Sequence, residues 1–329
     1  MNEPTPVIQT NNLTCRFGAV TAVDGLSLTV EPGEIFGLVG PDGAGKTTTL
    51  RMLAAIMDPS EGHATVAGFD TVKQAEAIKH RIGYMAQQFN LYGDLSVQEN
   101  LDFYADIFGV RGRERRERTE RLLRFARLTE FTGRRAANLS GGMKKKLALA
   151  CALIHQPEIL FLDEPTTGVD PISRREFWDI LSELHVDGVS ILVSTPYMDE
   201  AERCSRVALM YQGRLVVCDT PEQIKRLVPG DLVELRPLPA DPAMPSGIGL
   251  LRRAEAITAG LAGVLEVQTY GDLLHIFVDD AAERMPQIET ALAAHLIQPM
   301  GLRRAPARME EAFMSLIRAQ EECGVRNAE

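Results

Sequence analysis

The sequence has no long hydrophobic run and only a few, scattered cysteines. Its longest apolar stretch, residues 147–154, is far short of the ~20 residues that a membrane helix needs. If the protein works at a membrane, we therefore expect another chain to cross it. The five cysteines form no C-x-x-C pair, which argues against a cysteine metal site and indicates reduced thiols in a cytosolic protein. Residues 1–6 lack the basic and apolar regions of a signal peptide. The chain also has no excess of basic residues, since its formal net charge is −10. This acidic balance argues against a general nucleic-acid binder.

What is present has the composition of an ordinary globular protein. The chain has 329 residues, 45% of them hydrophobic and 24% charged. This length predicts about two domains and is ample for a sizeable core.

A glycine-rich stretch at residues 40–47 stands between an apolar run at 35–39 and a helix-compatible segment at 48–57. Strand, glycine-rich loop and helix in this order suit a phosphate-binding loop, because inward N–H groups and a helix N-terminus attract phosphate oxygens. Lys46 would then reach the β- and γ-phosphates, and the Thr47 hydroxyl would ligate Mg²⁺. The alternative is a glycine-rich turn that merely precedes a helix. The residues that we assign to nucleotide binding here are Gly40, Pro41, Asp42, Gly43, Ala44, Gly45, Lys46, Thr47 and Thr48.

Two carboxylates end a second apolar run. Residues 159–162 are followed by Asp163 and Glu164, which predicts a buried parallel strand that presents acids at the ligand-binding edge of the sheet. Asp163 would hold Mg²⁺ through a water molecule, and Glu164 would orient and polarise the attacking water. The alternative is a strand with an acidic turn, but the phosphate loop already supplies the other half of a phosphoryl-transfer site.

A Ser-Gly-Gly turn precedes this strand. Ser140, Gly141 and Gly142 open a helix that we predict to continue through residue 154, so their N–H groups make a second anion-binding turn. The same residues would also suit an ordinary helix cap or loop.

Two further features allow two interpretations each. Residues 7–30 predict a hairpin that turns at Phe17–Gly18, where the ring could stack on a purine base or be a half-buried strand residue. Residues 111–135 hold ten arginines against four glutamates. We favour an exposed helix with i,i+4 Glu/Arg pairs over a basic contact surface.

The order of these motifs resembles the ATP-binding subunits of ATP-binding cassette (ABC) transporters, and most of all those of bacterial drug- and antibiotic-export systems. The resemblance covers about residues 7–228. It rests on the phosphate loop, Gln87 after a strand, Leu139-Ser140-Gly141-Gly142, Asp163-Glu164 and Gly168-Val169-Asp170.

The resemblance implies roles for these residues. Phe17 looks like the residue that stacks on adenine, and Gln87 like the glutamine that senses Mg²⁺ and faces the membrane partner, which places it with Lys46 and Glu164 among the catalytic residues. Ser140, Gly141 and Gly142 resemble the signature that contacts ATP held by a second subunit. Asp170 resembles the acid that couples the two sites across the dimer.

The implied cofactors are ATP and Mg²⁺. The implied partners are a membrane permease and a second ATP-binding subunit, identical or not, at the cytoplasmic face of the cell membrane; no nucleic acid is expected. The implied fold is an α/β P-loop ATPase with antiparallel β and helical portions. It would occupy residues 1–228, with the helical portion at about 88–155.

Three positions depart from the family pattern. Asp42 stands where asparagine is usual, and Met143 replaces the common glutamine after Ser-Gly-Gly. Pro196 stands where the family usually has histidine, and proline offers neither an N–H nor a side-chain donor to a γ-phosphate. Losing one preorganised donor costs on the order of 10²–10³ in turnover, so we predict intact ATP binding and hydrolysis that is slow or borrowed from a more competent partner.

Residues 229–329 predict a second, α+β domain. Strands at 232–238, 264–270, 273–278 and 301–303, with helices at 250–261 and 286–296, give the order βαββαβ of a ferredoxin-like domain. An amphipathic helix at 309–323 follows. We expect a dimerisation or regulatory domain, as similar extensions in the family suggest.

Two functions of other classes compete with that of an ATP-hydrolysing subunit that drives a membrane permease. A soluble ABC-type ATPase acting on ribosomes or nucleic acid would use the arginine-rich segment, but the acidic net charge weakens it. A non-hydrolysing regulatory subunit is favoured by Pro196. A P-loop kinase lacks any sign of a second-substrate pocket. The direction of transport rests on resemblance alone, and the cargo is not encoded in this chain.

Overall fold

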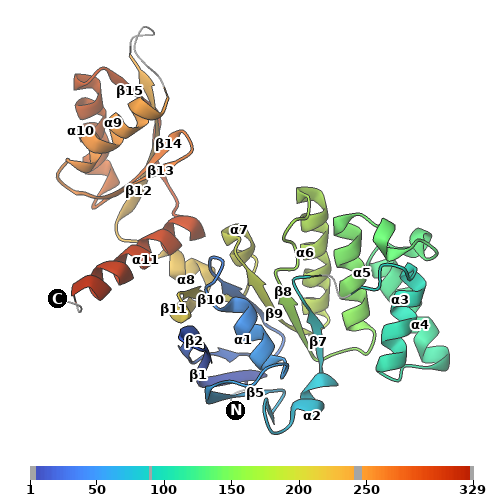
Figure 1. The fold of residues 1–329 in the computed structure, drawn as a ribbon. Coiled ribbons are helices and arrows are strands. Elements are labelled where there is room, and N and C mark those ends of the chain that lie inside the picture. Colours follow the sequence, from blue (N-terminus) through green and yellow to red (C-terminus); the bar gives the residue numbers. More distant parts are fainter. Residues whose placement is uncertain (1–4, 89–90, 241–246, 327–329) are drawn as a thin grey trace. The chain divides into compact units, whose positions relative to one another are not determined.

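The computed structural model describes residues 5–88, 91–240 and 247–326, and the chain divides into two compact units. The first extends to Pro221 and the second begins at Glu222, while the sequence analysis places the boundary after residue 228. The first unit is the expected α/β fold with an antiparallel sheet and a helical portion (Figure 1).

A mostly parallel six-stranded sheet forms the centre of the first unit. Only the pair β11–β10 is antiparallel. All side chains of β4 and β8 are buried, as expected for strands that helices cover on both faces. In sheet order the strands are β11 (Arg214–Asp219), β10 (Arg206–Tyr211), β4 (Ile35–Val39), β9 (Ser190–Thr195), β8 (Ile159–Asp163) and β7 (Ile82–Met85).

An antiparallel sheet packs beside it and contains the predicted hairpin. The hairpin strands are β1 and β2, which turn after Phe17. Their buried residues join the same core as those of β4, β5 and α1. The strands are β1 (Ile8–Phe17), β2 (Val20–Leu26), β3 (Thr29–Val30), β5 (Glu61–Val66) and β6 (Phe69–Asp70).

Helices α3, α4 and α5 gather on one side of the first unit (Figure 1). Helix α1 occupies residues 46–53 rather than the predicted 48–57, because Gly45 at φ 98° caps it directly after the loop and Ala55 at φ 54° leaves the helical conformation. The helices of the first unit are α1 (Lys46–Leu53), α2 (Ala75–Lys79), α3 (Val97–Ile107), α4 (Gly112–Phe125), η1 (Thr129–Phe131), η2 (Ala136–Asn138), α5 (Gly141–Leu153), α6 (Pro171–Val186) and α7 (Met198–Ala201). Helix α8 (Pro221–Lys225) begins at the boundary between the units.

The second unit has the predicted βαββαβ order. Its sheet order, β13-β14-β12-β15 with antiparallel neighbours, is that of a ferredoxin-like domain. The elements are β12 (Asp231–Pro239), α9 (Ile248–Ala259), β13 (Val264–Tyr270), β14 (Leu273–Val278), α10 (Ala281–Ala294), β15 (Ile297–Ala305) and α11 (Met309–Arg326).

Two predicted elements of this unit were too short. Helix α10 begins at Ala281, not at Pro286, because the Asp280 side chain accepts hydrogen bonds from the backbone of residues 282 and 283. Pro286 lies inside the helix, where it gives up one hydrogen bond. Strand β15 has nine residues instead of three because it pairs with β12 along most of its length.

In the described part of the chain, no helix combines the length and the apolar character needed to span a membrane.

Candidate active site

The phosphate loop joins β4 to α1 as predicted. Gly45 has φ 98°, which favours glycine, and a Cβ there would lie 2.4 Å from the carbonyl oxygen of Ala22 in β2. The loop can therefore pack against the β1–β2 hairpin only with glycine at this position. The backbone N–H groups at the start of α1 have no partner within the helix, which makes this end suitable for an anion.

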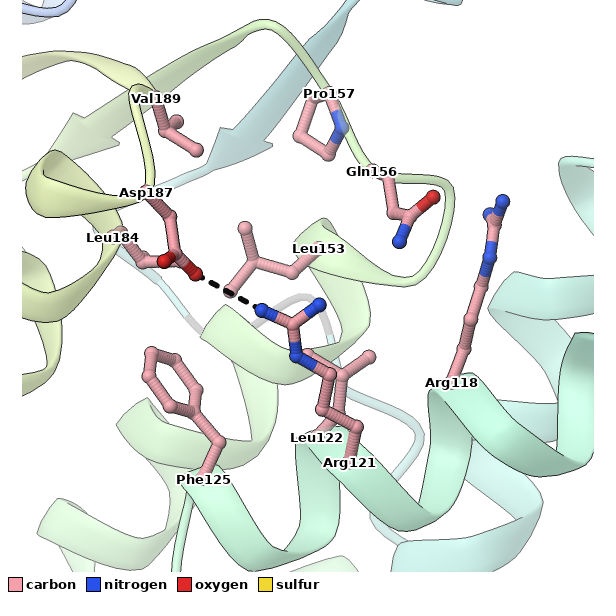
Figure 2. Close-up of a pocket in the computed structure, with 10 residues that line it drawn as sticks. All are labelled: Arg118, Arg121, Leu122, Phe125, Leu153, Gln156, Pro157, Leu184, Asp187 and Val189. Carbon is pink, nitrogen blue, oxygen red and sulfur yellow. Dashed lines mark hydrogen bonds and ion pairs between the residues drawn. The ribbon is translucent and has the colours of Figure 1, made fainter.

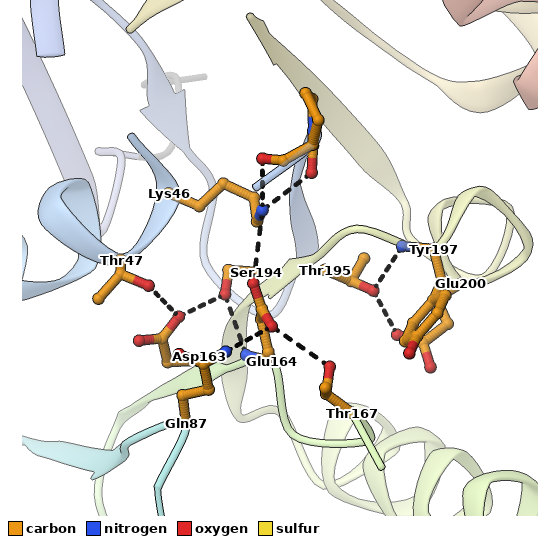
Figure 3. Close-up of polar contacts among 12 residues, drawn as sticks. Lys46, Thr47, Gln87, Asp163, Glu164, Thr167, Ser194, Thr195, Tyr197 and Glu200 are labelled. Atoms are coloured by element: carbon orange, nitrogen blue, oxygen red, sulfur yellow. Dashed lines mark hydrogen bonds and ion pairs between the residues drawn. The ribbon is translucent and has the colours of Figure 1, made fainter. Parts of the chain in front are cut away.

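Lys46 is buried beneath the loop. Its Nζ donates to the carbonyl oxygens of Gly40 at 2.8 Å and Pro41 at 2.9 Å, and it lies 3.4 Å from Oε1 of Glu164 (Figure 3). The lysine thus connects the phosphate loop to the acid at the end of β8, although the two are far apart in the sequence.

Asp163 receives two hydroxyl donors. Thr47 Oγ1 donates to Asp163 Oδ1 at 3.0 Å, and Ser194 Oγ donates to the same oxygen at 2.7 Å (Figure 3). A hydroxyl beside a carboxylate is the oxygen donor set that Mg²⁺ takes, so Thr47 and Asp163 fit the predicted metal role. Ser194 was missed by the sequence analysis. It lies opposite Asp163 in the β8–β9 register, a pairing that the sequence alone does not show.

Glu164 is held from several sides. Its φ of 45° is unusual for a non-glycine residue and stores about 1–3 kcal/mol of strain. Its backbone N–H donates to the carbonyl and the hydroxyl of Ser194. Its Oε2 accepts hydrogen bonds from Gln87 Nε2 at 2.8 Å and Thr167 Oγ1 at 3.3 Å (Figure 3). The structure therefore brings Gln87 to the carboxylate predicted to polarise water.

Lys145 is a second residue that the sequence analysis did not single out. Its Nζ donates to the carbonyl oxygen of Gln87 at 2.9 Å and to that of Glu164 at 3.4 Å. Burial lowers its pKa, against the opposing effect of Asp163 and Glu164. In the sequence it stands among three consecutive lysines, which gives no sign that one of them points inward.

The Ser-Gly-Gly turn caps α5. The Ser140 side chain accepts from the N–H of Met143 at 3.3 Å, and Ser140 and Gly141 are exposed. Gly142 is buried, and a Cβ there would lie 2.5 Å from Ser173 Oγ of α6. In Figure 1, β8, β9 and α6 lie between α1, which begins at the phosphate loop, and α5, which begins at this turn.

Asp170 and Phe17 lie at surface positions. Asp170 caps α6 by accepting from the N–H groups of Ile172 and Ser173, and the hydrogen bond from Ser173 is the main reason that its pKa is lowered. Phe17 ends β1 with 54% of its surface exposed, so its ring is open to a ligand.

Pro196 follows β9 directly beside the phosphate loop. The carbonyl oxygen of Thr195 accepts from the Gly40 N–H at 3.4 Å, which fixes this strand end against the loop. Thr195 Oγ1 donates to Glu200 at 2.7 Å and accepts from the N–H of Tyr197 (Figure 3). The backbone is thus positioned at the phosphate side, but position 196 carries no donor.

The arginine-rich segment is largely paired. Within α4, Arg113 pairs with Glu117 and Arg118 with Glu114, which confirms the predicted i,i+4 pairs. Arg121 reaches Asp187 at 2.9 Å across a cavity of about 360 Å³ between α4, α5 and α6 (Figure 2). Arg121 thereby connects α4 to the C-terminal end of α6.

The fold and the site define a P-loop nucleotide-binding domain: a buried lysine, a threonine hydroxyl and two acids meet at the carboxyl ends of β4, β8 and β9. Comparison with known proteins identifies the family. Residues 23–167 match the family model described as ABC transporter.

The chain is 50% identical over 226 residues to the probable multidrug ABC transporter ATP-binding protein YbhF of Escherichia coli (strain K12), which covers 68% of this chain and 39% of that protein. It therefore spans less than half of that relative's length. It is 37% identical over 318 residues to the Nod factor export ATP-binding protein I of Paraburkholderia xenovorans (strain LB400), which covers 95% of this chain and 97% of that protein.

Among solved structures it is similar to the ATP-binding cassette MJ0796, in a dimeric post-hydrolysis state bound to ADP and Pi. The TM-score is 0.60 at 26% identity, over 65% of this chain and 98% of that one. The chain belongs to the family of ATP-binding subunits of ABC transporters.

Proposed function

We propose that this chain binds MgATP and hydrolyses it to drive a separate membrane permease, at the cytoplasmic face of the membrane, in a transporter that exports drugs or other small molecules. The observation that carries the proposal is the contact of Lys46 with Glu164, beside the Thr47–Asp163 pair. Export is inferred from the names of the relatives, which describe those proteins.

Binding of the triphosphate would change the partner of Lys46. The lysine now faces Glu164, and β- and γ-phosphates would draw its ammonium away because they carry more charge. Glu164 would then be free to accept a proton from water while the Gln87 amide keeps the carboxylate oriented. The water oxygen bonds to the γ-phosphorus as the bond to the bridging oxygen breaks. Mg²⁺, held by Thr47 and Asp163 and sensed by Gln87, would neutralise phosphate charge.

A complete site requires two subunits in this proposal. The Ser140–Gly141 turn is exposed, and it would contact the nucleotide of a second subunit. The phosphate loop of one subunit and the Ser-Gly-Gly turn of the other would enclose the triphosphate. The Phe17 ring would be available to stack on adenine. Asp170, beside Gly168 at the start of α6, would connect the two sites.

A groove beside β7 is our candidate docking surface for the permease. It has a volume of about 370 Å³. Ile56 and Ile107, which line it, are 57% and 58% exposed. Exposed large apolar side chains around a groove are typical of an interaction surface. Because β7 leads directly to Gln87, a segment seated here could shift Gln87 and, through it, Glu164.

Pro196 supports one further candidate, a subunit that binds ATP but leaves hydrolysis to a more competent partner. The Gly40 N–H bonds to the Thr195 carbonyl and fixes this strand end beside the loop, and the missing donor at position 196 favours this candidate. The second unit would then serve dimerisation or regulation in either case.

The two candidates are separated by phosphate release from purified chain, compared with Glu164→Gln. A motor releases phosphate in the presence of Mg²⁺ and ATP, and the variant binds ATP without releasing it. Equal, background-level release from both proteins, with intact binding, would identify the non-hydrolysing subunit.

A further inference from the structure

Lys145 joins three parts of the active site. It lies on α5 five residues after Ser140, about 7 Å along the helix axis, and it is only 3% exposed. Its ammonium holds the carbonyl oxygens of Gln87 and Glu164, which follow β7 and β8. One side chain thus connects the Ser-Gly-Gly helix to both loops that carry the predicted catalytic groups.

A buried ammonium at this point has a cost that packing alone would not require. Burial disfavours the charged form of a lysine, and an apolar side chain would fill the space without that penalty. The neighbouring carboxylates of Asp163 and Glu164 offset part of this cost. The next lysine, Lys146, has another task, because it pairs with Glu176 of α6.

The contacts of Gln87 and Glu164 explain why their backbones must stay in register. The Gln87 amide donates to the Glu164 carboxylate at 2.8 Å, so a shift of either loop breaks this bond. Since α5 is a continuous helix, a displacement of the Ser140 turn moves Lys145 with it and pulls on both carbonyl groups.

We propose that Lys145 is a positioning residue for ATP hydrolysis, which holds Gln87 and Glu164 in register and transmits contact of the Ser-Gly-Gly turn with a second subunit to the Glu164 carboxylate. The inference rests on the proposed function.

The test compares Lys145→Met with Lys145→Arg in the full-length chain, with Arg113→Met on the exposed face of α4 as the control. MgATP affinity and phosphate release are measured on the same preparations. Lys145→Met should bind MgATP within about twofold of the wild type while kcat falls about 10- to 100-fold. Arginine, which keeps the charge, should restore most of the turnover. The control should match the wild type.

Hydrogen exchange gives a second measurement that does not depend on turnover. In Lys145→Met, the peptides containing residues 85–88 and 164–167 should exchange faster than in the wild type with MgATP bound. Unchanged exchange there, or turnover within about twofold of the wild type, overturns the role of Lys145. So does a parallel loss of binding and turnover in Lys145→Met. A wild-type chain that binds no MgATP refutes the proposed function instead.

Discussion

Replacing Pro196 by histidine should speed ATP hydrolysis. The Thr195 carbonyl is bonded to the Gly40 N–H, so residue 196 stands next to the phosphate loop, half-buried and without a donor. A histidine there adds one donor aimed at the γ-phosphate. A single preorganised donor is worth about 10²–10³ in kcat, or about 2.7–4 kcal/mol. The KM for MgATP should change little, because the loop and Lys46 are untouched.

The assay is steady-state phosphate release from Pro196→His, Pro196→Ala and wild type at saturating MgATP. Alanine removes the ring without adding a donor, so it should stay near the wild-type rate. If the wild type already hydrolyses ATP as fast as the histidine variant, the reasoning about position 196 is wrong. A gain with alanine equal to that with histidine would assign the effect to release of the proline ring instead.

Three further predictions concern other parts of the molecule. Ser194→Ala removes a buried hydroxyl that donates to a carboxylate, and it should lower the free energy of unfolding by about 1.5–3 kcal/mol in urea denaturation; no change would contradict the assigned bond. Ile107→Glu should leave MgATP affinity intact but weaken co-purification with the permease about tenfold, whereas Val186→Glu, at an 84% exposed site outside the groove, should not. Burial raises the pKa of Glu311, but the hydrogen bonds from His275 and from the Arg308 N–H together outweigh it, and the net pKa is lowered. Protection of α11 from hydrogen exchange, corrected for intrinsic rates, should therefore weaken as pH falls from 4.5 through that lowered pKa, and Glu311→Gln should flatten this dependence.

Local motifs carried most of what the sequence could predict. The phosphate loop, the strand with Asp163 and Glu164, and the Ser-Gly-Gly helix each depend on neighbours in the chain, so their elements could be recognised from short stretches. The βαββαβ order could be predicted because apolar periodicity is also a local property of the sequence.

Contacts between strands and helices that are distant in the sequence could not be predicted from it. Ser194 and Lys145 acquire their roles only when β9 lies beside β8 and α5 packs over the loop of Gln87. The predicted α10 was too short because a proline is usually found in the first turn of a helix. Here Asp280 caps the helix, which begins at Ala281, five residues before Pro286. Tertiary contacts decided the first two cases, and a local cap decided the third.

The affinity of the purified chain for MgATP, with and without Lys46→Ala, tests the central claim most directly. Saturable, magnesium-dependent binding is expected for the wild type, and loss of the ammonium should weaken it about 10- to 100-fold, since charge-assisted hydrogen bonds contribute about 1.5–3 kcal/mol each. A folded wild-type chain without affinity for MgATP, or a variant that binds as tightly as the wild type, would contradict the account.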